Sequence, residues 1–168
     1  MKVEIVYLQS YPAASFYSAQ IVSDDVVYGE YEYLNFTKRM SVDSFNRKQL
    51  HEIKAFIKHI GENGASEDLF KREDSAERLP PYWYKFLDSD GETDFGLRLY
   101  CVRVSHEIVI LLNGDRKTTK AVMNCANCYP YFKFAQRFAN AFYDAKYFGD
   151  IEISGHDINT EDNFILNI

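Results

Sequence analysis

Apolar and polar positions alternate along residues 2 to 8, which is the period of a strand that buries one face. Residues 26 to 36 are rich in Val and Tyr, and their tyrosines alternate with glutamates. This segment predicts a second strand, which would pair as a hairpin with Ile21-Val22 across the Asp24-Asp25 turn. The stretch before this hairpin is polar, contains Ser and Pro, and predicts no element.

Two segments have the spacing of amphipathic helices. In residues 44 to 60 apolar side chains recur every three or four positions, and Gly61 or Gly64 can end the helix. A second helix is expected to begin at Pro130 and to close at Gly149. Its aromatic stripe predicts a buried face and consists of Tyr131, Phe134, Ala135, Phe138 and Phe142.

The region between these helices contains a loop and a hairpin. Residues 61 to 79 are mostly polar and predict a solvated loop. Residues 97 to 104 and 108 to 112 predict a β-hairpin, joined by residues 105 to 107 and ended by the turn-forming pair Asn113-Gly114. Alternation places two sets of side chains on opposite faces of its first strand, namely Leu97, Leu99 and Cys101 against Arg98, Tyr100 and Val102.

Composition places the chain among compact domains. Its 168 residues suit a single domain, residues 1 to 168, with 46% apolar residues for a core. The start does not resemble a signal peptide, and no run approaches the roughly 18 apolar residues of a membrane span. We therefore expect a cytoplasmic protein that does not enter a membrane.

The motifs of common cofactor and metal sites are missing from the sequence. There is no P-loop, GxGxxG, HExxH or GxSxG motif. The three cysteines are an odd number and predict reduced thiols. Cys125 and Cys128 have redox-motif spacing, but the second ligand pair that a zinc site needs is missing. We expect neither a cofactor nor a metal ion.

The formal net charge of −6 conceals a segregation of charge along the chain. Residues 1 to 95 carry −6, residues 96 to 146 carry +5 and residues 147 to 168 carry −5. The basic block predicts an anionic ligand, of which phosphate is the simplest, or alternatively a basic surface without a ligand. By alternation Arg98 faces away from Arg103, so only some of its cations can converge. Its members are Arg98, Arg103, Arg116, Lys117, Lys120, Lys133 and Arg137.

The basic block resembles the later half of RelE/HigB-type toxins. The shared order is a strand bearing an Arg, a tight turn, a hydrophobic strand and a Lys-rich stretch before a helix. It is carried by Leu97-Arg98-Leu99-Tyr100, by residues 107 to 114 and by Arg116-Lys117-Thr118-Thr119-Lys120. The resemblance covers about residues 97 to 145. It implies an α+β fold in which a mainly antiparallel sheet packs against two principal helices, with additional N-terminal strands and a C-terminal tail around a RelE-like core.

The resemblance further implies a metal-independent endoribonuclease that cuts messenger RNA, often on the ribosome, and is silenced by a partner antitoxin. Arg98 would then stabilise the phosphate, Lys117 or Lys120 would contact the backbone or assist proton transfer, and Tyr100 would stack on or orient a base. The remaining contacts to RNA would come from Arg103, Arg116, Lys133 and Arg137. This chain differs from such toxins in being acidic and longer.

Two other functions remain open from the sequence. A non-catalytic interaction module of the same fold would bind a protein partner through its Tyr-rich strands and the surface of residues 80 to 86, since Tyr, Trp and Arg favour interfaces. A small enzyme of another type would use His106 or His156. Growth suppression on expression alone would distinguish a toxin from a binding module.

Overall fold

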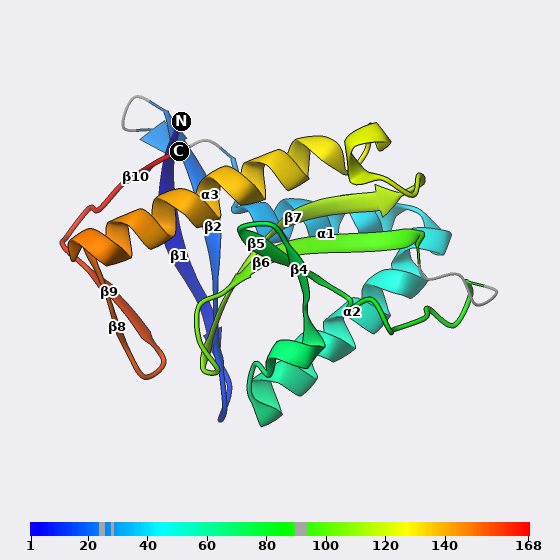
Figure 1. Cartoon of the computed structure of the whole chain (residues 1–168), viewed down its shortest axis with the longest axis horizontal. Helices are drawn as coiled ribbons and strands as arrows, with labels where there is room; N and C mark the ends of the chain where they lie inside the picture. The colour runs from blue at the N-terminus through cyan, green and yellow to red at the C-terminus, as the bar shows by residue number, and fades with distance from the viewer. Residues whose placement is uncertain (24–25, 28, 90–93) are drawn as a thin grey trace.

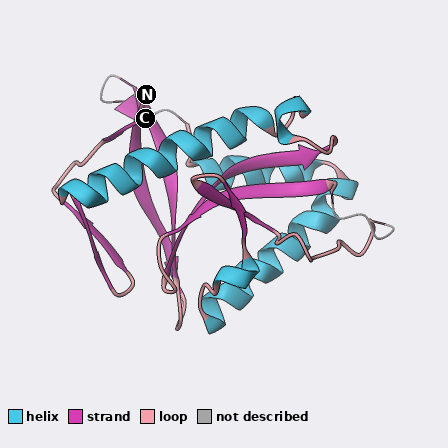
Figure 2. Ribbon diagram, in the orientation of Figure 1, coloured by secondary structure: helices cyan, strands magenta, loops and turns pink. Residues whose placement is uncertain are grey.

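A central β-sheet with helices on both faces forms the framework of the protein (Figures 1 and 2). The computed structural model describes residues 1–23, 26–27, 29–89 and 94–168. The described strands are β1 (Lys2–Ser10), β2 (Ser15–Ser23), β3 (Val26–Val27), β4 (Lys71–Glu73), β5 (Ala76–Leu79), β6 (Gly96–Arg103), β7 (Ile108–Lys117), β8 (Ile151–Ser154), β9 (Asp157–Thr160) and β10 (Leu166–Asn167). The helices are α1 (Glu32–Val42), α2 (Ser44–Asn63) and α3 (Tyr129–Phe148), with 3₁₀ helices at Glu67–Leu69 and Val122–Asn124.

The main sheet runs in the order β10-β1-β2-β7-β6-β5-β4, with β3 paired to β2. Its described strand pairs are antiparallel except for β2 and β7, which run parallel through the register Ser15↔Ile108 to Ser18↔Leu111. The expected α+β class with a mainly antiparallel sheet is therefore confirmed. Among the described residues, no helix is both long and apolar enough to span a membrane.

The β6–β7 hairpin is the centre of the sheet, as the sequence predicted. Leu97, Leu99 and Cys101 face a core formed with α1 and α2, whereas Tyr100 and Val102 face a core formed with α3. Burial on both faces explains the nearly continuous apolar run in β7. The predicted strand end at Asn113-Gly114 is wrong, because β7 continues to Lys117. A Cβ on Gly114 would lie 1.8 Å from the Arg98 carbonyl oxygen, so this glycine permits a close strand approach beside a register shift instead of forming a turn.

The predicted strand over residues 26 to 36 is wrong for most of its length. Only Val26–Val27 forms a strand, and it pairs with the end of β2 as the expected hairpin, whose Asp24-Asp25 turn lies outside the described residues. Helix α1 begins at Glu32 because Glu32, Phe36 and Met40 repeat every four residues and are buried together. The alternation of tyrosine and glutamate covers too few residues to show this four-residue period. The helix adds a third α-helix to the two that were predicted.

The first part of β2 and the strands β4 and β5 were not predicted. Strand β2 begins in the polar stretch near the N-terminus, and its residues Ser15 and Ser18 are buried with hydrogen bonds; Ser18 Oγ donates to the Leu111 carbonyl at 2.7 Å. The loop expected over residues 61 to 79 contains the β4–β5 hairpin, and β5 is buried throughout. Its charged residues pair within the hairpin, as with Arg78 Nε and Glu73 Oε1 at 2.8 Å. Because these charges pair with each other, a hairpin with one buried strand has a charged sequence that resembles a solvated loop.

Helices α2 and α3 confirm their predictions. Asp43 caps the start of α2 by accepting from the Phe45 amide at 2.8 Å, and Gly64 ends it with φ near +100°. Gly149 ends α3 in the left-handed conformation. The chain then forms the separate β8–β9 hairpin and returns as β10, which pairs with β1 and brings the termini together (Figure 1).

Candidate anion-binding site

Strands β4 to β7 place a cluster of cationic side chains around one small cleft. The β6–β7 pairing sets Gly96 against Lys117 and Arg98 against Asp115, which brings two predicted site residues, Arg98 and Lys117, to the same end of the hairpin. The cleft has a volume of about 90 Å³, roughly three times the space of one water molecule in the liquid. Its lining consists of Lys71, Glu73, Arg78, Arg98, Tyr100, Lys117, Lys120 and Val122. We call this the cationic cleft.

The cationic cleft contains five cations and one carboxylate among its lining residues. The carboxylate, Glu73, pairs with Arg78 at 2.8 Å and with Lys71 at 3.3 Å. Arg98 is 1% exposed and donates from Nη1 to the Leu97 carbonyl at 2.9 Å. Positive charge therefore exceeds negative charge among the described residues that line the cleft, and a bound anion would reduce the difference.

The pKa values of Arg98 and Lys117 are lowered by burial and by this crowding of positive charge. Burial and then the neighbouring Arg78 lower the pKa of Arg98 from 12.5 to about 10. Burial also lowers the pKa of Lys117, and Arg98, Arg78 and Lys71 lower it further. Both side chains are cations whose charged form the protein disfavours. A bound anion would raise both pKa values.

Tyr100 forms part of the cleft wall in a packed environment. Its ring is 1% exposed and lies edge-on to Phe132 with ring centroids 5.9 Å apart. Burial, and next the nearby Cys128, raise its pKa well above the ordinary value. Stacking of a base on this ring would require Phe132 to move.

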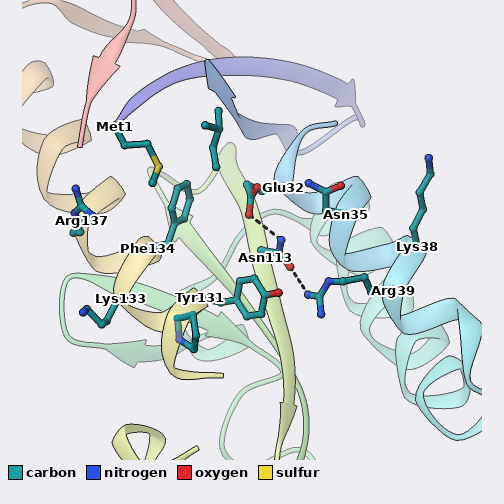
Figure 3. Close-up of a pocket in the computed structure, with 12 residues that line it drawn as sticks. Met1, Glu32, Asn35, Lys38, Arg39, Asn113, Tyr131, Lys133, Phe134 and Arg137 are labelled. Carbon is teal, nitrogen blue, oxygen red and sulfur yellow. Dashed lines mark hydrogen bonds between the residues drawn. The ribbon is translucent and has the colours of Figure 1, made fainter. Parts of the chain in front are cut away.

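The other predicted RNA contacts lie elsewhere. Arg103 is on the opposite face of β6, as alternation predicted, where its Nε donates to the Ala65 carbonyl. Arg116 stacks over the Phe45 ring at 4.2 Å and donates to Asn46 at 2.6 Å. Lys133 and Arg137 line a separate cavity between α1 and α3, shown in Figure 3. The structure thus brings together Arg98, Tyr100, Lys117 and Lys120 of the predicted set.

Three residues of the cationic cleft were absent from the predicted site, because the polar sequence of their hairpin predicts a loop. Lys71 and Glu73 come from β4, and Arg78 comes from β5. The turn between these strands contains Asp74 with φ near +60°, a conformation that Asp tolerates in tight hairpins. The sequence signal for this hairpin is the pair Asp74-Ser75, which lies between two short segments of alternating charge.

Cys125 and Cys128 lie beside this site, ahead of α3. Burial alone would raise the pKa of Cys125, but hydrogen bonds from Thr118 and Cys128 outweigh it and lower the pKa to about 7. Burial, and next the neighbouring Cys125, raise the pKa of Cys128 to about 12. Both thiols are free. Within the described part of the chain, no three His, Cys, Asp or Glu side chains are placed to hold a metal ion together.

The chain matches no protein-family model, no curated protein and no solved structure.

Proposed function

We propose that the protein is a metal-independent endoribonuclease of the RelE/HigB type, that an antitoxin silences it, and that the cationic cleft holds the phosphodiester to be cut. The main support is the convergence of five cationic side chains around a space of phosphate size. A phosphodiester is an anion that such a group of cations can bind. Charge-assisted hydrogen bonds from guanidinium groups to phosphate are also among the stronger polar interactions in proteins.

The reaction is an internal transesterification of RNA. The ribose 2′-oxygen attacks the adjacent phosphorus, an O2′–P bond forms and the P–O5′ bond breaks. The products are a 2′,3′-cyclic phosphate and a free 5′-hydroxyl. Arg98 and Arg78, both buried in the cleft wall, stabilise the negative charge that develops on the non-bridging oxygens.

The lysines of the cleft supply the two proton transfers. Lys117 has a lowered pKa, so its neutral amine is more available than that of an ordinary lysine to accept the 2′-hydroxyl proton. Lys120 is exposed at the mouth of the cleft, and its ammonium group donates a proton to the departing 5′-oxygen. The cleft accommodates one phosphate, so flanking nucleotides would lie on the surface around Lys71 and Lys120.

The test is inducible expression followed by growth and by the integrity of messenger RNA. Lys117→Ala and Lys120→Ala are the informative variants, because neither side chain is fully buried. Arg98→Lys keeps the charge of the buried arginine but removes the fork that can bind phosphate through two hydrogen bonds. Lys54→Ala, an exposed position on α2, is the control with the same charge change.

Wild type and Lys54→Ala should arrest growth and cleave RNA, and the purified proteins should yield 2′,3′-cyclic ends on a labelled oligonucleotide. The cleft variants should lose at least about tenfold in rate, since general acid–base groups contribute about 10²–10⁴-fold. Equal cleavage by wild type and Lys117→Ala/Lys120→Ala would refute the assignment of the site.

A non-catalytic interaction module remains the second candidate because apolar side chains are exposed near residues 80 to 86. Tyr82, Trp83 and Leu87 are 67%, 50% and 92% exposed. Phe56 packs edge-on to Tyr84 with ring centroids 4.7 Å apart and supports this surface from α2. Normal growth and intact RNA with soluble wild-type protein would favour this function.

A further inference from the structure

A second cavity lies where the parallel strands β2 and β7 separate. Their pairing ends at Ser18 and Leu111, and later residues of both strands, Ile21 and Asn113, line one cavity of about 630 Å³ between α1 and α3 (Figure 3). Small-molecule sites commonly have volumes of about 300–1,000 Å³. In open α/β sheets, ligands favour the carboxyl ends of parallel strands where the chain connections diverge. We call this cavity the α1–α3 pocket.

The floor of the α1–α3 pocket contains a buried carboxylate. Glu32 is 8% exposed, and its Oε2 accepts a hydrogen bond from Asn113 Nδ2 at 2.8 Å. Its Oε1 has no hydrogen-bond partner among the residues that the structure describes. The nearby Arg39 is occupied elsewhere, since it donates to Asp115, Asn113 and the Gly114 carbonyl. A ligand that donates an N–H group would satisfy Glu32.

Apolar and aromatic side chains form the pocket walls. Tyr131 and Phe134, three residues apart on α3, line the same wall, and Arg39 lies 4.7 Å from the centroid of the Tyr131 ring (Figure 3). Ile21 of β2 also lines the pocket. The Arg39 guanidinium is itself fixed by three acceptors, so the position of the Tyr131 ring is preorganised. Such walls fit a flat ring.

The rim adjoining α3 carries excess positive charge. Lys133 and Arg137 lie four residues apart on α3, and neither makes a salt bridge within the described ranges. Like charges at this spacing repel on a helix, and an anionic group between them would remove the repulsion. Lys38 on the opposite rim already pairs with Glu30. The anion is therefore expected beside α3.

We infer that the α1–α3 pocket binds a guanine nucleotide, with the guanine N–H groups on Glu32, the ring against the wall formed by Tyr131 and Phe134, and the phosphate at Lys133 and Arg137. Guanine presents two adjacent N–H donors, which match a carboxylate. Adenine would turn a ring-nitrogen acceptor toward the same group, and a mismatched buried polar group costs affinity. This site shares no residue with the cationic cleft.

Titration calorimetry with guanosine 5′-monophosphate and the full chain tests this inference. Wild type should bind one equivalent, and guanosine without phosphate, or adenosine 5′-monophosphate, should bind at least about tenfold more weakly. Lys133→Ala/Arg137→Ala should weaken binding by about tenfold or more, because both substitutions remove charge-assisted phosphate contacts. Glu32→Gln should weaken guanosine 5′-monophosphate but leave adenosine 5′-monophosphate nearly unchanged, a difference that general unfolding would not produce.

Matched variants separate this site from the cationic cleft. Lys117→Ala/Lys120→Ala and the surface control Lys54→Ala should bind guanosine 5′-monophosphate like wild type. Absence of binding at millimolar nucleotide would overturn the inference. Equal affinity for the two nucleotides, or loss of binding in Lys117→Ala/Lys120→Ala with retention in Lys133→Ala/Arg137→Ala, would also overturn it. These results are independent of whether the protein cleaves RNA.

Discussion

Inorganic phosphate should stabilise the protein by binding in the cationic cleft. The pKa of Arg98 is lowered from 12.5 to about 10, which at about 1.4 kcal/mol per unit represents an electrostatic cost of roughly 3 kcal/mol, set first by burial and then by Arg78. A negatively charged phosphate in the cleft would lower this cost by direct electrostatic attraction. At a concentration one hundred times its dissociation constant it would add about 2.7 kcal/mol to the free energy of unfolding. For a chain of this size the melting temperature would rise by roughly 5–10 °C.

The assay is thermal unfolding in phosphate, compared with chloride at equal ionic strength to remove general screening. Lys117→Ala/Lys120→Ala should lose most of the phosphate-dependent rise, whereas Lys133→Ala and Lys54→Ala should retain the rise from the cationic cleft. Because the pKa of Lys117 is lowered, its charge is lost at a lower pH than that of an ordinary lysine, so its contribution to phosphate affinity should be lost at a correspondingly lower pH as pH rises. An equal rise in wild type and Lys117→Ala/Lys120→Ala would refute the reasoning.

Three further predictions concern the surroundings of the cleft. Glu73→Gln removes the carboxylate that pairs with the buried Arg78, so the free energy of unfolding in denaturant should fall by about 3 kcal/mol, and phosphate should restore part of it. Gly114→Ala would place a Cβ 1.8 Å from the Arg98 carbonyl oxygen, so the same measurement should show a loss of about 3 kcal/mol. Cys125 is fully buried, so its ionisation should be followed by the ultraviolet absorbance of the thiolate. The absorbance that is lost in Cys125→Ala should appear around pH 7 in wild type, because the thiolate forms as pH rises through its lowered pKa of about 7.

Each of these predictions has a control in the same chain. Glu62→Gln breaks an exposed pair with Lys58 and should cost less than about 0.5 kcal/mol. Gly155→Ala has φ near +56° but nothing within 4 Å, so only backbone strain of about 1 kcal/mol is expected. Cys128→Ala should leave the thiolate absorbance near pH 7 unchanged, because the pKa of Cys128 is about 12. Equal losses of stability in a variant and its control, or equal loss of thiolate absorbance in Cys125→Ala and Cys128→Ala, would contradict the corresponding argument.

The local sequence pattern was sufficient to predict the elements in which side chains alternate or repeat with a regular period. The alternation in β6 correctly separated Leu97, Leu99 and Cys101 from Tyr100 and Val102. The apolar spacing in α2 and α3 likewise predicted their buried faces and their glycine ends. Charge order along the chain placed Arg98, Lys117 and Lys120 in one basic segment, and these three side chains do line one cleft.

The tertiary structure alone decided where polar residues are buried. Strand β2 and the β4–β5 hairpin look solvated in sequence. The buried Ser18 is satisfied by the distant Leu111 carbonyl, and the buried Arg78 is satisfied by Glu73 only once the hairpin forms. The parallel pairing of β2 with β7 joins segments more than ninety residues apart, so no local pattern could predict the α1–α3 pocket. Periodicity reports which face of an element is buried, whereas long-range pairing decides which faces meet. As a result, Lys133 and Arg137 line the α1–α3 pocket, whereas Arg98 lines the cationic cleft.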